Sequence, residues 1–155
     1  MDEEDRSLLT RVADYQFGRG AGTTLFPPGE VLEVTHASSG RPRQIRGPDG
    51  RLATYGTAGR LTLGVTGGAW LHAGLPDGDY RVVVGQKSEP FVRDGGNVFA
   101  KFVREADSGI RPRDEVLVVH EEGRLLGVGR AVLSGAGMLD FETGMAVRIR
   151  EGVGD

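Results

Sequence analysis

The sequence predicts an α+β fold in two parts, a small α+β domain over residues 1–79 and a β-rich domain over residues 80–155. Three observations lead to this prediction. An amphipathic helix begins the chain, and glycine accounts for 26 of the 155 residues. After the turn Pro76-Asp77-Gly78, the pattern changes to short apolar runs separated by single glycines. Glycines placed in this way are typical of the tight turns and bulges of a β-rich fold.

The first part begins with a helix and continues with short strands. Between Glu4 and Phe17, apolar residues at helical spacing define one face, which we expect to include Tyr15. The glycines from Gly18 onward end this helix. We expect strands over residues 31–35, 44–46, 52–55 and 61–65, a hairpin turn over 47–50 and a short helix over 67–75.

The second part has several short strands and only small helices, which predicts a barrel or a sandwich. We expect strands over residues 81–84, 98–103, 115–119, 125–133 and 145–150, and a short helix or turn that opens over 94–97. Within the fourth of these strands, Gly127 and Gly129 predict a close approach by another backbone. In the last strand, Met145, Val147 and Ile149 alternate with other residues, so one face should pack in the core.

The residues that most enzymes and metal sites require are absent or scattered. The chain has no cysteine, which removes disulfides, thiol catalysis and cysteine-based zinc sites. The three histidines, His36, His72 and His120, lie far apart in sequence, and neither a G-x-S-x-G elbow nor a Walker A loop is present. We therefore expect no metal, no cofactor and no catalytic activity of its own.

The chain shows no signal for secretion or membrane insertion. Residues 1–5 are acidic, whereas a secretory signal begins with basic and then apolar residues. No apolar run approaches the roughly 18 residues that a membrane span needs. Together with the absence of cysteine, these features predict a cytoplasmic protein without membrane contact.

Charge is distributed unevenly along the chain. The net charge is −3, but residues 41–60 hold five arginines and one aspartate, and residues 81–113 hold seven basic and four acidic residues. A polyanion responds to such local fields more than to the total charge. Arginine outnumbers lysine 17 to 2, which suits phosphate contact. The nucleotide composition of the genome explains this bias equally well.

Four segments resemble PUA domains, in the family's order. Residues 94–103 resemble the first helix and second strand, residues 110–119 resemble the family's i-x-P-G-D-E-V strand, and residues 126–131 and 144–150 resemble the last two signature strands. Upstream, residues 12–18, 40–45 and 61–64 are similar to the small α+β domain that precedes PUA in archaeosine tRNA-guanine transglycosylases, which are archaeal enzymes. The resemblance implies a PUA-type β pseudo-barrel over residues 80–155.

The resemblance also implies docking of tRNA without base exchange, because these 155 residues include nothing similar to the family's catalytic barrel with its aspartates and zinc site. Two departures from the family pattern leave the RNA contacts open. Arg113 stands where the family usually has glycine, and Gly137-Met138 stands where an acidic residue commonly precedes methionine.

In the family, the PUA surface around the first helix and second strand meets the tRNA acceptor stem and CCA end. Carried over by position, the RNA-binding residues are Gly95, Gly96, Asn97, Lys101, Phe102, Arg104, Arg111, Arg113 and Arg130. The glycines would allow close approach, with amides at a helix start that favour phosphate, and the cations would neutralise phosphates. Phe102 would either stack on an unpaired base or pack in the core. Arg148 and Arg150 project together from the last strand, where they would either contact RNA or form a solvated face.

Three hypotheses about function follow. The first is an RNA-binding protein that docks tRNA by itself. The second is a non-catalytic subunit that acts in trans with a tRNA-guanine transglycosylase or another tRNA-modifying enzyme. The third is a protein-interaction module, for which the net acidity is the main support. The sequence leaves open whether the basic segment 41–60 contacts RNA.

Overall fold

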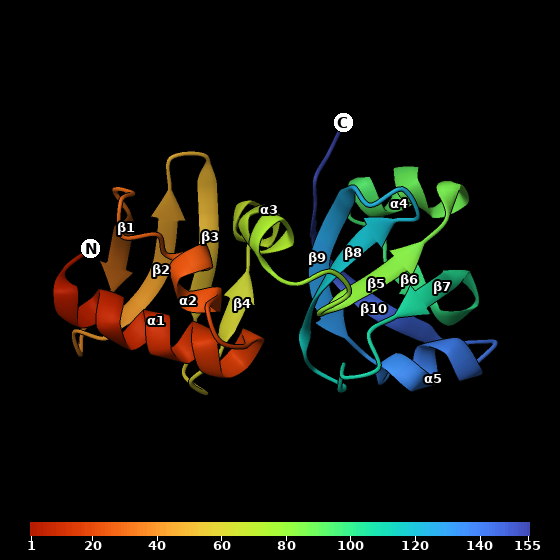
Figure 1. The fold of residues 1–155 in the computed structure, drawn as a ribbon, viewed down its shortest axis with the longest axis horizontal. Helices are drawn as coiled ribbons and strands as arrows, with labels where there is room; N and C mark the ends of the chain where they lie inside the picture. Colours follow the sequence, from red (N-terminus) through yellow and green to blue (C-terminus); the bar gives the residue numbers. More distant parts are fainter. The chain divides into compact units, whose positions relative to one another are not determined.

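The chain divides into two compact units. The computed structural model describes all 155 residues, with residues 1–75 in unit 1 and residues 76–155 in unit 2 (Figure 1). The boundary therefore lies just before the turn Pro76-Asp77-Gly78, a few residues earlier than the boundary expected from the sequence. None of the helices is long and apolar enough to cross a membrane.

Unit 1 is a four-stranded antiparallel sheet with helices. Its elements are α1 (Glu3–Phe17), α2 (Ala21–Leu25), β1 (Glu33–His36), β2 (Pro42–Gly47), β3 (Gly50–Tyr55), β4 (Leu61–Leu63) and α3 (Val65–Gly74). The strand order is β1-β2-β3-β4, and α1 and α2 lie in front of this sheet in Figure 1. The predicted hairpin is confirmed, because β2 and β3 pair up to Gly47 opposite Gly50.

The first helix forms where the sequence predicts it, but with a different buried face. Asp2 caps it by accepting a hydrogen bond from the Asp5 amide at 2.8 Å. Leu9, Ala13 and Phe17 are buried, whereas Tyr15 is 95% exposed. The expectation that Tyr15 belongs to the buried face was wrong. At about 100° per residue, Tyr15 lies about 200° around the helix from both Ala13 and Phe17, on the side away from the core.

Unit 2 is a six-stranded, nearly closed β barrel with short helices, which confirms the predicted α+β fold with a PUA-type pseudo-barrel. Its elements are β5 (Arg81–Val84), the 3-10 helix η1 (Gln86–Ser88), α4 (Glu89–Arg93), β6 (Val98–Phe99), the 3-10 helix η2 (Ala100–Phe102), β7 (Val103–Ala106), β8 (Glu115–His120), β9 (Leu125–Ala131), α5 (Gly135–Asp140) and β10 (Met145–Gly152). The strand order is β6-β10-β9-β8-β5-β7, and only β5 and β8 pair in parallel. Helices α4 and α5 lie at opposite ends of the barrel in Figure 1.

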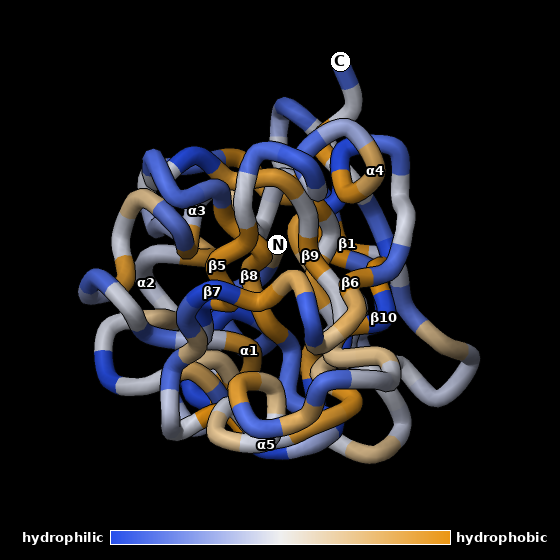
Figure 2. The backbone as a smooth tube through the Cα atoms, turned by 90° about the vertical axis from the view of Figure 1, so that its right-hand side faces the viewer, coloured by the Kyte–Doolittle hydropathy of each residue, from blue (hydrophilic) through white to orange (hydrophobic).

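The core of unit 2 fills the inside of this barrel. Figure 2 shows the hydrophobic stretches along β5 and β8. The buried cluster contains Val82, Val84, Val92, Val98, Ala100, Ile110, Val116, Val118, Leu126, Ala131, Met138, Ala146, Val147 and Ile149. The close approach predicted for the strand glycines is confirmed. A Cβ at Gly129 would lie 2.2 Å from the Arg148 carbonyl oxygen, so only glycine fits there.

The segment after β5 differs from the expectation in two ways. Of the short helix or turn expected to open over residues 94–97, the structure has the turn, whereas the helix, α4, lies earlier and ends at Arg93. Gly95 then adopts φ +93°, a conformation that favours glycine, and turns the chain away from the helix. The strand expected over residues 98–103 is interrupted by η2, so β6 and β7 lie at opposite edges of the sheet.

Candidate nucleic-acid interface

A largely apolar pocket opens on unit 2 between α4, β6 and η2. Its volume is about 490 Å³, and its lining consists of Lys87, Ser88, Phe91, Val92, Gly96, Asn97, Val98, Phe99 and Phe102. Three of these are exposed phenylalanines: Phe91 is 69% exposed, Phe99 46% and Phe102 40%. Large apolar side chains usually avoid water, so three of them around one opening indicate a binding surface. We call this opening the aromatic pocket.

A second hollow adjoins the aromatic pocket on the other side of Phe99 and Phe102. It measures about 370 Å³ and is lined by Phe99, Lys101, Phe102, Glu142, Thr143 and Gly144. Lys101 extends over Phe102, with Nζ 5.1 Å from the ring centroid. The chain has only two lysines, and one lies in each of these adjoining hollows. Two aromatic rings are therefore accompanied by ammonium groups that suit the phosphates of an unpaired nucleotide.

Local structure explains why the pocket forms here. The Gly96 amide donates to the Phe91 carbonyl oxygen at 2.7 Å, and a Cβ on Gly96 would lie 2.8 Å from that oxygen. Only glycine therefore lets the chain turn back so tightly against α4. Asn97 then accepts a hydrogen bond from the Ile149 amide at its Oδ1, at 2.8 Å. This bond anchors the start of β6, where Phe99 pairs with Met145.

A network of ion pairs also holds α4 in place. Glu89, in the first turn of α4, accepts from Arg124 Nη2 at 2.7 Å and from Arg93 Nε at 2.9 Å. Hydrogen bonds from Arg124 and then from Arg93 lower the pKa of the Glu89 carboxyl from 4.5 to about 2. Beside it, the buried His120 pairs with Gln86 Oε1 through Nε2 at 2.9 Å. The turn between β8 and β9 is thereby fixed to η1 and α4.

The structure brings four of the sequence-predicted residues together at the two hollows. Gly96, Asn97 and Phe102 line the aromatic pocket, and Lys101 and Phe102 line the second hollow. The exposure of Phe102 excludes the alternative that it packs in the core. One argument was wrong: the Gly95 amide donates to Val92 and closes the C-terminal end of α4. These amides do not form a helix start that attracts phosphate.

The four predicted arginines lie elsewhere on unit 2. Arg104 is exposed on β7, Arg111 and Arg113 lie in the loop before β8, and Arg130 is exposed on β9. Arg113 adopts φ +80° and donates its amide to the Ala131 carbonyl oxygen at 2.7 Å. Arg113 therefore adopts the backbone conformation that favours glycine, the residue that the family pattern has at this position. None of the four guanidinium groups forms an ion pair within the protein.

Of the lining residues missed from the sequence, three carry a positive charge or an exposed ring: Lys87, Phe91 and Phe99. Phe99 falls on a short strand where alternation predicts one buried and one exposed residue, and Val98 is the buried one. Lys87 and Lys101 are the chain's only lysines, and this bias toward one region was a signal in the sequence. Phe91 lies on a five-residue helix, which is too short to show a periodic pattern.

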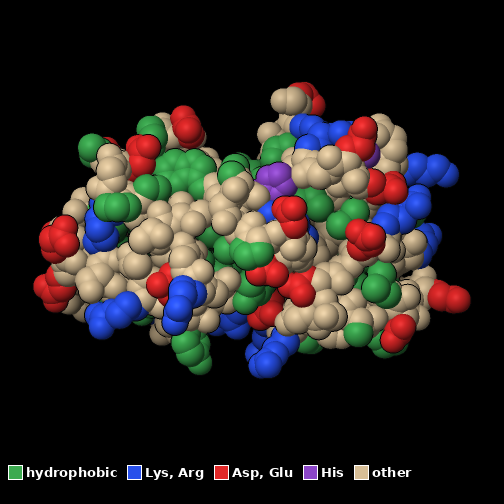
Figure 3. Space-filling model, viewed as in Figure 1, with side chains coloured by type: hydrophobic (Ala, Val, Ile, Leu, Met, Phe, Trp, Pro, Cys, Tyr) green, Lys and Arg blue, Asp and Glu red, His purple; other side chains and the backbone are tan.

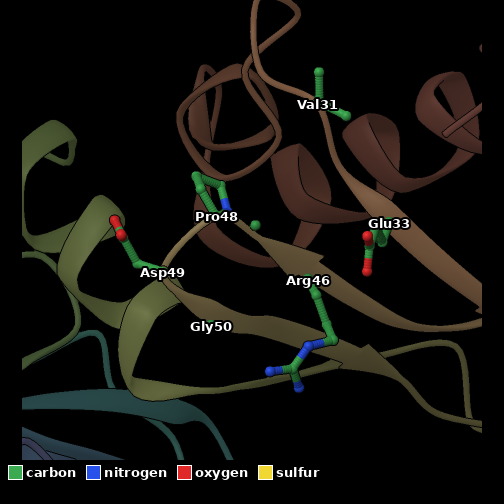
Figure 4. Close-up of a pocket in the computed structure, with 7 residues that line it drawn as sticks. Val31, Glu33, Arg46, Pro48, Asp49 and Gly50 are labelled. Atoms are coloured by element: carbon green, nitrogen blue, oxygen red, sulfur yellow. The ribbon is translucent and has the colours of Figure 1, made fainter.

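Unit 1 holds a more polar pocket of about 380 Å³, lined by Val31, Glu33, Arg46, Gly47, Pro48, Asp49 and Gly50 (Figure 4). One guanidinium there accompanies two carboxylates, so this pocket does not favour phosphate.

Within the basic segment 41–60, Arg41 lies 4.1 Å from the Tyr55 ring centroid, and Arg51 donates to Thr54. Figure 3 shows positive and negative side chains interspersed on the face in view, without a field of one sign.

Each of the two units matches a known domain family. Residues 80–153 match the PUA domain, and residues 7–77 match the patch-forming domain C2 of tRNA-guanine transglycosylase. The chain carries a C2 domain followed by a PUA domain. The PUA domain is an RNA-binding fold, so the aromatic pocket lies on a fold of that class.

Archaeal proteins match this chain over both units. The tRNA-guanine(15) transglycosylase of Pyrococcus furiosus is 49% identical over 146 residues, which are 94% of this chain and 24% of the relative. The same enzyme of Thermococcus kodakarensis is 46% identical over 151 residues, 97% of this chain and 26% of the relative. The C2 and PUA domains thus span about a quarter of the length of these curated relatives.

A solved structure has the same fold over its whole length. The crystal structure of a hypothetical protein from Pyrococcus horikoshii matches 100% of this chain and 93% of its own, with a TM-score of 0.73 and 24% identity. At this identity the match shows the fold alone. The fold of the two units is therefore also found in a solved protein of similar length.

Proposed function

We propose that the chain docks tRNA through its PUA domain, with the unpaired CCA end in the aromatic pocket and the acceptor stem against the neighbouring surface. The observation that supports this most is the grouping of Phe91, Phe99 and Phe102 around one opening, each at least 40% exposed. Stacking of a base on such a ring contributes about 1–3 kcal/mol and accepts any base. Lys87 and Lys101 supply the charge for the intervening phosphates.

The sequence-predicted residues divide into two roles under this proposal. Gly96, Asn97, Lys101 and Phe102 hold the unpaired end, with Gly95 shaping the turn beside them. Arg104, Arg111, Arg113 and Arg130 contact phosphates of the stem, because none of their guanidinium groups forms an ion pair within the protein. Arginine suits this role since its planar fork matches two phosphate oxygens.

We further propose that these residues contribute docking and no catalytic step. The most strongly shifted carboxyl group of the chain, Glu89, accepts hydrogen bonds from two arginines, and a pKa of about 2 leaves it ionised. Such a carboxylate is an ion-pair partner and a poor proton donor or base near neutral pH.

The test compares three ligands of similar length: tRNA with an intact CCA end, the same tRNA with that end trimmed, and duplex DNA. Binding of the purified protein is measured by gel shift at fixed salt, because affinities for nucleic acid depend on ionic strength. We expect the intact tRNA to bind most tightly. Equal affinity for the intact and trimmed tRNA would place the RNA outside the aromatic pocket.

A second candidate function is a subunit that supplies C2 and PUA domains in trans to a tRNA-guanine transglycosylase. The identity of 49% to an enzyme of that name favours it. The measurement is guanine exchange into tRNA by a transglycosylase barrel that lacks these domains, with and without this chain. Stimulation that requires tRNA binding supports the second candidate. Binding of the barrel without any affinity for tRNA would favour a protein-interaction module instead.

A further inference from the structure

Two arginines lie directly opposite each other on neighbouring strands of unit 2. In the antiparallel pair of β9 and β10, Arg130 is the register partner of Arg148. Both side chains are exposed, and neither forms a hydrogen bond or an ion pair within the protein. Residues opposite each other in an antiparallel pair have Cβ atoms about 4.5–5.5 Å apart. Two positive charges are therefore held side by side on this face.

The acidic residue opposite Arg130 on the next strand is already paired with another arginine. On β8, Glu115 is the register partner of Arg130, but its carboxylate accepts from Arg150, with Nη2 2.8 Å from Oε2. Glu115 is only 3% exposed, so this ion pair is built into the sheet. The structure thus reveals a difference between Arg148 and Arg150 that the sequence pattern does not show. Arg150 has a carboxylate partner, whereas Arg148 faces another arginine.

Like charges directly opposite each other destabilise a sheet, and an oxyanion between the two guanidinium forks would remove that repulsion. We propose that Arg130 and Arg148 together bind one phosphate group of an RNA backbone. This arginine pair extends the proposed tRNA docking and rests on it. It adds Arg148, which the carried-over family positions do not include, and gives Arg130 a partner.

The position of the arginine pair fits an RNA whose end lies in the aromatic pocket. β10 is the shared neighbour, because it pairs with β6 on one side, at Phe99, and with β9 on the other. Neighbouring strands lie about 4.8 Å apart, and residues rise about 3.4 Å along a strand. The arginine pair is therefore within about two nucleotides' reach of Phe99, where it would contact the backbone next to the unpaired end.

The experiment uses two RNA hairpins, one with a single-stranded 3′ overhang and one with a blunt end. Binding to both is measured over a salt series for the wild type, Arg130→Ala, Arg148→Ala and the double variant. We expect Arg148→Ala to lower affinity several-fold for both hairpins and to reduce the salt slope by roughly 0.7 to 0.9. The double variant should lose less than the sum, because both side chains bind the same phosphate.

Two further variants provide matched comparisons. Phe102→Ala should weaken binding of the overhang hairpin only. Arg19→Ala removes the same charge from an exposed arginine of unit 1 that has no ion pair, and it should leave affinity and slope unchanged. Thermal melts separate binding from folding, since removing one of two opposed like charges should raise the melting temperature slightly.

The outcomes distinguish this inference from the proposed function. If the wild type binds neither hairpin, the RNA-docking function itself is wrong. If the wild type binds while Arg130→Ala and Arg148→Ala both keep its affinity and salt slope, the arginine pair is wrong and the docking function stands. An Arg148→Lys variant that keeps the slope but binds more weakly than the wild type would support contact by the guanidinium fork.

Discussion

Arg124 donates two hydrogen bonds to Glu89, from Nη2 to Oε1 at 2.7 Å and from Nε to Oε2 at 2.8 Å. The two residues belong to distant segments of the chain, the turn before β9 and the first turn of α4. A bidentate pair of this kind fixes orientation as well as distance. It therefore determines how α4 presents Phe91 to the aromatic pocket.

The first prediction concerns that pair. Glu89→Gln should lower stability, because it leaves Arg124 and Arg93 without their shared carboxylate. It should also weaken tRNA binding while leaving the salt slope unchanged, since Glu89 contacts no phosphate. The measurements are thermal melts and a salt titration. Glu122→Gln is the control, because Glu122 also accepts from Arg124 but its side chain is 70% exposed; its effect should be smaller.

The second prediction is a pH dependence. The pKa of Glu89 is lowered from 4.5 to about 2 in the folded protein by Arg124 and Arg93. A lowered pKa stabilises the fold above the ordinary value, and that contribution disappears as pH falls from about 4.5 to about 2. Urea unfolding between pH 6 and pH 2 should therefore show a smaller loss of stability in Glu89→Gln than in the wild type. Parallel curves for the two proteins would contradict this assignment.

The third prediction tests stacking in the aromatic pocket. Phe99→Ala and Phe102→Ala should each weaken binding of tRNA with an intact CCA end by up to about 1–3 kcal/mol. Binding of the trimmed tRNA should change little. Phe141→Ala is the matched control, because Phe141 is 55% exposed and lines neither hollow. Equal losses for all three variants would indicate a general effect on the surface.

The fourth prediction concerns single phosphate contacts. Lys101→Ala and Arg111→Ala should each reduce the salt slope of log affinity by roughly 0.7 to 1 and weaken binding to all tRNAs similarly. Arg43→Ala, in the basic segment of unit 1, is measured beside them. A loss of slope in Arg43→Ala alone would move the RNA from unit 2 to residues 41–60.

The fifth prediction uses the backbone of Arg113, at φ +80°. A non-glycine residue in this conformation costs about 1 kcal/mol, so Arg113→Gly should raise stability in denaturant while weakening tRNA binding. Arg111→Gly serves as the comparison, because Arg111 is not among the residues with positive φ, and its stability should not rise. If Arg113→Gly binds tRNA as tightly as the wild type, Arg113 contacts no phosphate.

The sequence predicted the strands better than the helices, for physical reasons. Alternation in β10 and the glycine turn between β2 and β3 are local signals, and the turn formed as expected. The alternation holds from Val147 to Arg150, but Ala146 is buried, because the register with β6 shifts between Met145 and Val147. Helix α4 was misplaced because Gly95-Gly96 can stand at either end of a helix, and five residues show no periodicity. The exposure of Tyr15 and Phe102 depends on which neighbours cover them, and only the assembled fold decides that.

The same limit applies to the candidate site. Resemblance to PUA domains identified Lys101 and Phe102, and the structure places both beside the aromatic pocket. It could not show that Arg150 has a carboxylate partner while Arg148 lacks one, because that difference depends on the register of β9 against β10. Pairings between strands determine which charges are neutralised, and a shift of one residue in register would change every such pair.

The pairing of β6 with β10 also has a consequence for protein synthesis. Phe99 pairs with Met145, and the Ala100 amide donates to the Gly144 carbonyl oxygen at 2.9 Å. β10 follows the other five strands of this barrel in the sequence, so during synthesis the wall of the aromatic pocket that carries Phe99 gains its neighbour only after those strands have been made. The aromatic pocket is therefore completed only when the last strand of its own barrel is in place.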